Sequence, residues 1–360
     1  MSHVLSEKIK FRKLPDLFTL SDGSKVASLE DWERRREEIR EVLLREEYGF
    51  MPEAPAEVRA VTQERDEGAF ANKAVWAKLQ ICFDTPKGEF SFPVDLIVPK
   101  AVAKPPVFLH IAFRPDVPDS YLPMEELLDQ GFAVANFCYN DVTADTLDES
   151  GLASMYDRDP LYGWGKISMW AWAASRVMDY LVTLDTVDSS RVAVVGHSRL
   201  GKTALLCGAM DERFSMVISN ESGCGGAALN RWKGGERIKD LEQVVPYWFC
   251  GQFQNHVDGE NEMSFDQHFL LALSAPRALY IASAQLDDWA DPLSEFLSAY
   301  AASPVYTLYG KIGLVTKDEL PPLDQPLQEG TVGYHMRSGS HFFSRTDWLQ
   351  YVQYRKAHNV

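Results

Sequence analysis

The most informative stretch of the chain is VVGHSRLGKTAL, residues 194–205, because it fits two different chemistries. From Gly196 to Thr203 it matches the pattern G-x-x-x-x-G-K-T, in which backbone N–H groups and Lys202 hold the phosphates of a nucleotide. The same letters contain G-x-S after an apolar run, which is typical of a nucleophile elbow with Ser198 at its tip. One pattern predicts nucleotide binding, and the other predicts attack on a carbonyl carbon.

The rest of the chain supplies the groups that a nucleophilic serine requires. A neutral serine hydroxyl is a poor nucleophile, so it needs a histidine base and a carboxylate that orients the histidine. In α/β-hydrolases these groups follow in the order serine, acid, histidine, each after a strand. Glu221 follows the apolar run MVISN, Asp287 follows RALYIASAQL, and His341 lies late in RSGSHFF. The order serine, acid, histidine is therefore met with either Glu221 or Asp287 as the acid. His335 is the alternative to His341 as the base.

Two departures from the patterns bear on the choice. A nucleotide-binding fold usually begins at its phosphate loop, whereas more than half of this chain, with several strand-like runs, precedes Gly196. The nucleophile elbow usually has glycine two residues after the serine, whereas here Leu200 holds that position and Gly201 follows. A third hypothesis, a carbohydrate-binding protein without catalysis, does not explain why serine, histidine and acids are all present.

Composition excludes several classes of partner. The net charge of −16 argues against nucleic acid, which selects a basic surface. No apolar run approaches the roughly 20 residues of a membrane helix. The cysteines form no C-x-x-C pair, and Cys82, Cys138 and Cys207 lie in apolar runs, which predicts buried free thiols. The sequence as written shows no signal peptide, so we expect a cytoplasmic protein, or a secreted or periplasmic one if a leader has been removed.

Strand-like and helical stretches predict one α/β domain over residues 1–360. Strand-like runs precede the elbow (VWAKLQICF, FPVDLIVP, PVFLHIAF, FAVANFCY) and follow it (MVISNE, RALYIASA, PVYTLYG). Helices are expected around MEELLDQG, at KISMWAWAASRVMDYLVTL, from about Arg199 to Met210, and near TDWLQYVQYRKAH. An extension of about 50 residues contains a helix that begins with a Ser28–Asp31 capping box. Two long loops, about 221–263 and 311–340, follow strands on the side where α/β sheets bind ligands.

The motifs as a series resemble those of carbohydrate esterase family 15, the glucuronoyl esterases. The series is GHSRLGK, NESGCGGAA, PYWF, FDQHFLLALSAPRALYIAS, DWADP and GYHMRSGSH, and DWERRREEI with EEYGFMP is similar to bacterial members. The resemblance runs from about Asp31 to Trp348, and arginine directly after the serine makes it specific. It implies an α/β-hydrolase fold, a three-layer sandwich with a central, mostly parallel sheet. It also implies hydrolysis of (4-O-methyl-)glucuronate esters, such as those between xylan and lignin alcohols, through an acyl-enzyme.

The resemblance also implies roles for individual residues. Ser198 is the expected nucleophile and His341 the expected base, while the backbone N–H and side chain of Arg199 stabilise the oxyanion. Glu221 matches the carboxylate of fungal members, and Asp287 matches the usual hydrolase position and an acid of some bacterial members. We favour Glu221 and leave Asp287 open as a second contributor.

Further residues are expected to contact the substrate. The resemblance places Lys202 at the sugar hydroxyls and Trp289 beside the uronate, while Trp248 in PYWF is either a sugar contact or a core anchor. Fungal members have a disulfide where His197 and Ser340 stand here, so that bond is not expected. No cofactor or metal is expected, and the partner is a small-molecule or oligosaccharide uronate ester bound by a monomer. A general carbohydrate or small-molecule carboxylesterase, such as an acetyl esterase, is the alternative.

Overall fold

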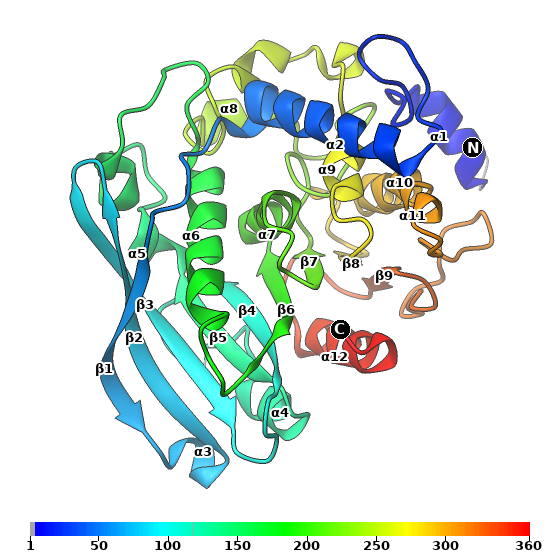
Figure 1. Cartoon of the computed structure of the whole chain (residues 1–360). Coiled ribbons are helices and arrows are strands. Elements are labelled where there is room, and N and C mark those ends of the chain that lie inside the picture. The colour runs from blue at the N-terminus through cyan, green and yellow to red at the C-terminus, as the bar shows by residue number, and fades with distance from the viewer. Residues whose placement is uncertain (1–3, 118) are drawn as a thin grey trace.

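The computed structural model describes residues 4–117 and 119–360, in which nine strands form one sheet (Figure 1). The strands are β1 (Val58–Asp66), β2 (Ala74–Thr85), β3 (Gly88–Pro99), β4 (Pro106–Ala112), β5 (Ala133–Cys138), β6 (Asp188–His197), β7 (Met216–Asn220), β8 (Ala278–Ala284) and β9 (Val332–Arg337). Their order is β1-β2-β3-β5-β4-β6-β7-β8-β9. In this order, the first three pairs (β1 with β2, β2 with β3, β3 with β5) are antiparallel. The remaining pairs, from β5 with β4 to β8 with β9, are parallel.

Helices cover both faces of this sheet. They are α1 (Leu5–Arg12), α2 (Leu29–Leu43), the π-helix η1 (Leu44–Tyr48), α3 (Ala69–Asn72), α4 (Met124–Asp129), α5 (Tyr139–Val142), the 3₁₀ helix η2 (Gly151–Met155), α6 (Lys166–Leu181), α7 (Arg199–Met210), α8 (Ile238–Val244), the 3₁₀ helices η3 (Phe253–His256) and η4 (Glu260–Glu262), α9 (His268–Ala272), α10 (Pro292–Ala302), α11 (Val305–Leu308) and α12 (Arg345–His358). The larger core lies under α2, α6, α7, α9 and α10, and the smaller core under α4 and α12 (Figure 1).

The alternation of apolar residues along the strands divides them between the two cores. In β4, Leu109 and Ile111 belong to the larger core, whereas Phe108 belongs to the smaller core and packs on Trp348 of α12 at 5.4 Å between ring centroids. A strand that is covered on both faces is expected to be nearly continuously apolar. The β4 and β5 segments fit this expectation apart from His110 and Asn136, which are buried and hydrogen-bonded to each other at 2.8 Å. The predicted three-layer α/β-hydrolase architecture with a mostly parallel sheet is confirmed.

The observed elements differ from the sequence predictions in several places. PVYTLYG forms the short helix α11 and not a strand, because Val305 and Tyr306 are buried against the helical layer. The last parallel strand, β9, lies inside the segment 311–340 that was predicted to be a loop, while the loop 221–263 contains α8, η3 and η4. The edge strand β1 was not predicted, because its residues are mostly exposed and polar and it is held by pairing with β2.

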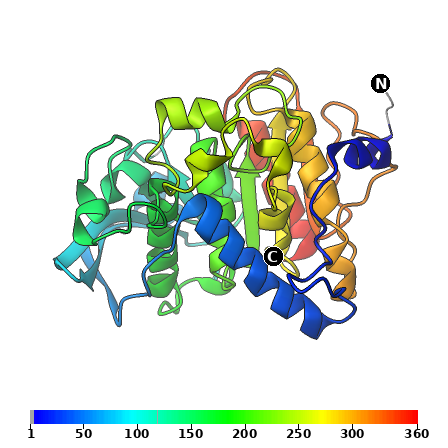
Figure 2. The ribbon, with the colours of Figure 1, turned by 90° about the horizontal axis from the view of Figure 1, so that it is seen from above.

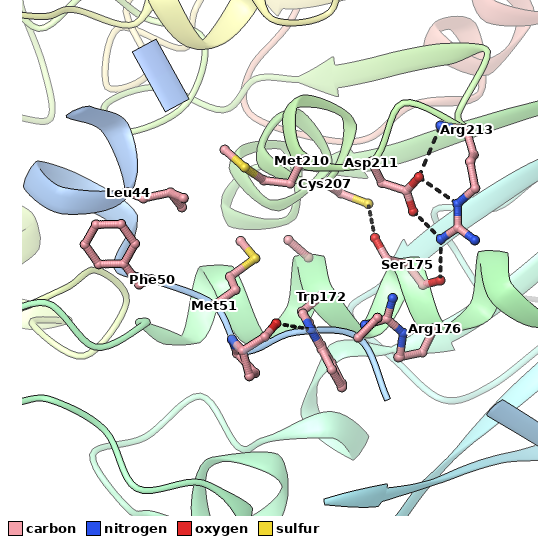
Figure 3. A pocket seen from close by; sticks show the side chains of 13 residues that line it. Leu44, Phe50, Met51, Trp172, Ser175, Arg176, Cys207, Met210, Asp211 and Arg213 are labelled. Carbon is pink, nitrogen blue, oxygen red and sulfur yellow. Dashed lines mark hydrogen bonds and ion pairs between the residues drawn. The ribbon is translucent and has the colours of Figure 1, made fainter. Parts of the chain in front are cut away.

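The N-terminal residues wrap around the helical side of the larger core. The predicted capping box at Ser28 and Asp31 is present, and α2 crosses this side of the molecule over α9 (Figure 2). The chain then runs along α6, where Pro52 accepts a hydrogen bond of 3.1 Å from the Trp172 indole (Figure 3). A cavity there is lined by residues including Cys207 and Met210, at the C-terminal half of α7. It is therefore about one helix length away from Ser198, which precedes the N-terminus of α7.

Two further expectations concern the cysteines and the absence of a membrane helix. All five cysteines are buried and unpaired, as was predicted for Cys82, Cys138 and Cys207. No helix in the described part of the chain is long and apolar enough to cross a membrane.

Candidate active site

Ser198 occupies a one-residue turn between a strand and a helix. Strand β6 ends at His197 and α7 begins at Arg199, while Ser198 has φ 57° and ψ −128°. That left-handed conformation is uncommon for a residue with a side chain, and at a functional site it holds the group in an exposed, fixed position. A side chain at Gly196 would lie 2.0 Å from the carbonyl oxygen of Leu200, so glycine is required there.

The departure at Leu200 from the usual elbow pattern has a packing explanation. Leu200 is fully buried in the larger core. Gly201 is the position at which α7 approaches β7 closely, since a Cβ atom there would lie 3.0 Å from both Ser219 Oγ and Ser222 Cβ. The close approach of helix and strand is thus made one residue later than in the usual pattern, and the turn at Ser198 is preserved.

The same geometry rules out a phosphate loop. A phosphate loop needs several residues of open backbone before the helix, whereas here Ser198 alone separates β6 from α7. Thr203 lies within α7 and donates to the carbonyl oxygen of Arg199 at 3.0 Å. Lys202 is held by hydrogen bonds to the carbonyl oxygens of Ser222 and Cys224 and to Glu236, so its ammonium is directed toward the loop after β7 and not toward the turn at Ser198.

Both candidate acids contact His341, at unequal distances. His341 Nδ1 lies 2.7 Å from Asp287 Oδ2 and 3.3 Å from Glu221 Oε2. Asp287 follows β8 and Glu221 follows β7, and both side chains are buried. Asp287 therefore makes the shorter hydrogen bond, although Glu221 was the acid favoured from the sequence. Since Nδ1 faces the carboxylates, Nε2 is the ring nitrogen left to take the proton of a nucleophile.

The two carboxylates and the histidine change one another's pKa. Burial lowers the pKa of His341, but hydrogen bonds to Asp287 and Glu221 outweigh burial and raise it to about 9. Burial raises the pKa of Glu221 to about 7 against the opposing effect of His341 and Arg337. Burial also acts to raise the pKa of Asp287, but the hydrogen bond from His341 prevails and lowers it. Asp287 is thus the carboxylate that is ionised over the wider pH range.

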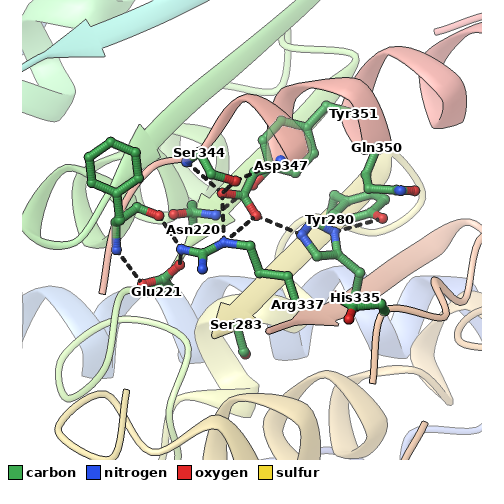
Figure 4. A network of polar contacts seen from close by, with 12 residues as sticks. Asn220, Glu221, Tyr280, Ser283, His335, Arg337, Ser344, Asp347, Gln350 and Tyr351 are labelled. Atoms are coloured by element: carbon green, nitrogen blue, oxygen red, sulfur yellow. Dashed lines mark hydrogen bonds and ion pairs between the residues drawn. The ribbon is translucent and has the colours of Figure 1, made fainter. Parts of the chain in front are cut away.

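A buried polar network holds Glu221 and the loop that carries His341 (Figure 4). Arg337 donates to Glu221 Oε1 at 2.6 Å, to both oxygens of Asp347 at 3.1 Å, and to the carbonyl oxygen of Phe342. Glu221 Oε2 accepts the N–H of Phe342 at 3.0 Å. Both oxygens of Glu221 are therefore bound to residues at β9 and beyond, so Glu221 fixes the His341 loop as well as contacting the ring.

The alternative base, His335, belongs to this network and not to the cavity. It is buried, with Nε2 2.8 Å from Asp347 Oδ1 and Nδ1 3.1 Å from the Tyr280 hydroxyl. Both ring nitrogens are occupied, which leaves none for a proton transfer to Ser198. His335 is thus a structural histidine in this fold.

Arg199 is held beside Ser198 by an acid that the sequence analysis did not identify. Its guanidinium forms an ion pair with Asp145 and lies 4.9 Å from the ring centroid of Trp248 and 5.5 Å from that of Phe113. Trp248 is almost fully buried and donates to Asp145 at 2.6 Å. Trp248 thus supports Arg199 and anchors its loop. Because Arg199 begins α7, its backbone N–H has no acceptor within the helix and is free for an oxyanion.

His197 packs against His341 with the two rings tilted by 36°, and it is held neutral. Its Nδ1 donates to Asn220 Oδ1 at 2.6 Å, and the two imidazole centroids are 4.5 Å apart. Burial, and secondarily the charge of His341, lowers the pKa of His197 to about 3. His197, Glu221 and His341 offer atoms within 4.8 Å of one another, a spacing that suits a metal. Protein partners already use Nδ1 of both rings and both oxygens of Glu221, so the arrangement fits a hydrogen-bonded site better than a metal site.

The remaining predicted residues meet in a cavity of about 340 Å³ that Ser198, Arg199 and His341 also line. Lys202 donates to the carbonyl oxygens of Ser222 at 2.7 Å and Cys224 at 2.5 Å and to Glu236 at 3.0 Å, so all three protons of the ammonium have acceptors. The other oxygen of Glu236 accepts the Trp289 indole N–H at 3.2 Å. Glu236, which the sequence analysis did not identify, therefore connects Lys202 to Trp289.

Trp289 is exposed in a way that core packing does not explain. More than half of its surface (57%) is open to solvent, although the neighbouring Ala290 is buried. An exposed tryptophan at the rim of a cavity offers an apolar face and an N–H donor to a ligand. The contact of Trp289 with a sugar ring stays a prediction.

The pKa of His341 predicts the pH dependence of the reaction. His341 acts as a base only when neutral, and its raised pKa keeps it protonated at neutral pH, so activity is lost as pH falls through that pKa. We expect kcat/KM for an ester substrate to rise about tenfold per pH unit below a limb near pH 9. Glu221→Gln removes one carboxylate and moves the limb to lower pH. A limb near the ordinary histidine value of about 6.5 in both proteins would contradict this interpretation.

Comparisons with known proteins identify related chains over nearly the whole length. A family model described as "Glucuronyl esterase, fungi" matches residues 84–310. A carbohydrate esterase from an unknown prokaryotic organism is 34% identical, covering 96% of this chain and 89% of that protein. The 4-O-methyl-glucuronoyl methylesterase of Podospora anserina is 31% identical, covering 79% of this chain and 58% of that protein. A glucuronoyl esterase from Solibacter usitatus has a structure with a TM-score of 0.89 and 36% identity, covering 96% of this chain and 97% of that one.

Proposed function

The chain belongs to the glucuronoyl esterase family, carbohydrate esterase family 15, and from this premise we propose that it hydrolyses esters of glucuronic acid through a serine acyl-enzyme. Members of the family are carboxylic ester hydrolases. The observation that carries the proposal for this chain is the 2.7 Å hydrogen bond of His341 to Asp287 in the cavity that Ser198 lines. A nucleophile, a base and an acid from three separate strand ends converge there.

The proposed reaction proceeds in two steps. Ser198 Oγ attacks the ester carbonyl carbon while His341 Nε2 takes the hydroxyl proton, and Asp287 and Glu221 stabilise the resulting imidazolium. The oxyanion receives the N–H of Arg199 and the positive charge of its guanidinium. Collapse of this intermediate breaks the carbon–oxygen bond, and the departing alcohol takes the proton from His341. Water then attacks the acyl carbon while His341 takes its proton. The bond between this carbon and Ser198 Oγ breaks, His341 returns the proton to Oγ, and the uronic acid leaves.

Recognition of the uronate is assigned to the wall formed by Lys202, Glu236 and Trp289. Glu236 presents carboxylate oxygens that accept from sugar hydroxyls, and Trp289 presents an exposed ring to the sugar face. The protons of Lys202 are all bound in the free protein, so a sugar hydroxyl binds Lys202 by replacing one of its present acceptors. This wall distinguishes a uronate ester from an acetyl ester, which has no ring to contact it.

The substrate assignment is tested by comparing two esters of one alcohol. We expect wild-type protein to hydrolyse benzyl glucuronate with a kcat/KM at least about 100-fold above that for benzyl acetate, because only the uronate uses the Lys202–Glu236–Trp289 wall. Release of benzyl alcohol is measured for both by chromatography. Faster hydrolysis of the acetate would keep the serine mechanism and favour the alternative, a general carboxylesterase.

The role of Arg199 gives a separate prediction. Arg199→Met is expected to lower kcat by about 100-fold with little change in KM, since a cation that faces the oxyanion acts mainly in the transition state. Asp145→Asn leaves the guanidinium in place without its ion pair and lowers kcat by about tenfold. Steady-state kinetics on benzyl glucuronate separate kcat from KM. A change in KM alone would show that Arg199 binds the ground state and not the oxyanion.

A further inference from the structure

Two exposed aromatic rings lie side by side where helix α1 contacts the loop 221–263. Phe11 of α1 and Trp232 of the loop are 63% and 53% exposed, and their ring centroids are 5.4 Å apart. Trp232 also has a left-handed backbone, with φ 53°, which is unfavourable for a large side chain. Neither burial nor backbone preference explains a tryptophan at this position, so its ring is available for a ligand.

The aromatic pair is connected to the catalytic cavity by one short segment. A hollow under α1 is lined by Phe11, Trp232 and Leu293 among others. Leu293 also lines a second hollow, together with Gly234, Gly235 and Asp288. Glu236 and Trp289, which follow Gly235 and Asp288 in the sequence, line the catalytic cavity. Residues 232–236 therefore form a common wall of three adjoining hollows, which we call the 232–236 trough.

Hydrogen bonds fix this wall in place. The backbone N–H of Trp232 donates to Asn261 Oδ1 at 3.1 Å, that of Gly234 to Asp291 Oδ2 at 2.9 Å, and that of Glu236 to the carbonyl oxygen of Trp289 at 2.9 Å. Gly235 packs so closely that a Cβ atom there would lie 2.3 Å from a backbone oxygen of Asp288. The wall is thus preformed, and little ordering is required when a ligand binds it.

We propose that the 232–236 trough binds further sugar units of the glycan that carries the esterified uronate, with Trp232 and Phe11 as the stacking platform. The inference rests on the proposed function, which assigns Glu236 and Trp289 to the uronate ring. The trough begins at these two groups, so it continues from the sugar end of the substrate. Its mixture of aromatic faces with the charged Glu7 and Lys8 suits pyranose rings, which have apolar faces and polar edges.

Kinetics on two esters of different length test the trough. The double variant Phe11→Ala/Trp232→Ala is expected to raise KM about five- to tenfold for the methyl ester of a 4-O-methylglucuronosyl xylotriose, with kcat unchanged. Hydrolysis of methyl glucuronate, which ends at the Glu236–Trp289 wall, stays unchanged. Val61→Ala, an exposed apolar change on the edge strand β1, is the matched control. Equal effects on both esters, or no effect on the longer one, would overturn the proposal. An effect confined to esters of bulky aromatic alcohols would assign the trough to the alcohol instead.

A binding measurement separates this inference from the proposed function. Ser198→Ala protein is titrated calorimetrically with the free acid of the same xylotriose derivative, which requires no turnover. Trp232→Gly in this background removes the ring and relieves the left-handed backbone, so we expect weaker binding together with a Tm that is no lower. Unchanged affinity would overturn the trough even if the esterase activity is present. Loss of affinity in a protein without uronate esterase activity would keep the trough and reject the proposed function.

Discussion

Replacing Ser198 with alanine is expected to lower kcat for benzyl glucuronate by at least about 10⁴-fold and to leave the fold intact. Without Oγ the protein has no nucleophile for the acyl-enzyme, and only the oxyanion donors and substrate binding remain to assist direct attack by water. A serine that precedes a helix could also serve only as its N-cap, and that role would predict a loss of stability instead. The side chain makes no capping hydrogen bond, so the alanine variant keeps the helix terminus as it is.

The two properties are measured on the same samples. Hydrolysis of benzyl glucuronate and the Tm of Ser198→Ala are compared with those of Ser190→Ala, a change of an exposed serine before the elbow. We expect the control to match wild type in both, and Ser198→Ala to match it in Tm alone. Substantial residual hydrolysis by Ser198→Ala would show that another group attacks the ester.

Removing both carboxylates from His341 is the second large change. Asp287→Asn is expected to lower kcat by about 10²- to 10³-fold, because its 2.7 Å hydrogen bond is the shorter and an amide does not stabilise the imidazolium. Glu221→Gln is expected to lower kcat by only about tenfold, because its contact is 3.3 Å and Asp287 remains. The double variant then loses about 10⁴-fold, as expected for a triad without its acid.

Comparison of the three variants decides how the acids share their role. If each carboxylate partly replaces the other, the double variant loses more than the product of the two single losses. Circular dichroism and Tm check the Glu221 variant in particular, since Arg337 also donates to this carboxylate. If Glu221→Gln lowers kcat more than Asp287→Asn does, with unchanged stability, Glu221 is the principal acid. That result would contradict the assignment of Asp287 from its shorter distance to His341.

The sequence predicted the parts of the fold that have a strong local pattern. The apolar runs of the central strands and the capping box of α2 correspond to observed elements, because both depend on residues close together in the chain. The edge strand β1 was missed because its exposed residues carry no apolar pattern, and β9 was missed because it is short and follows a long irregular segment. Pairing with a neighbouring strand, which a single segment does not reveal, defines both.

Prediction of the site was also limited to what the local sequence reveals. The order of Ser198, the acids and His341 could be read from the chain, because Ser198 and both acids follow apolar runs and each group has a chemistry of its own. The strand before His341 was not part of that prediction. Asp145 and Glu236 were not identified, since each acts through a residue far away in sequence. The relative distances of Glu221 and Asp287 to His341 also depend on the tertiary structure. The match to the phosphate-loop pattern was a coincidence of local sequence. The structure has only Ser198 between β6 and α7, which leaves no loop to hold a phosphate.

The most direct test is a crystal structure of Ser198→Ala soaked with the methyl ester of 4-O-methylglucuronate. We expect the ester carbonyl oxygen within hydrogen-bond distance of the Arg199 N–H, and the sugar hydroxyls on the side of Glu236 and Lys202 with the ring against Trp289. The ester carbon then lies where Ser198 Oγ attacks in the wild-type protein. An ester bound outside the cavity, or one whose carbonyl points away from Arg199, would contradict the proposed glucuronoyl esterase mechanism.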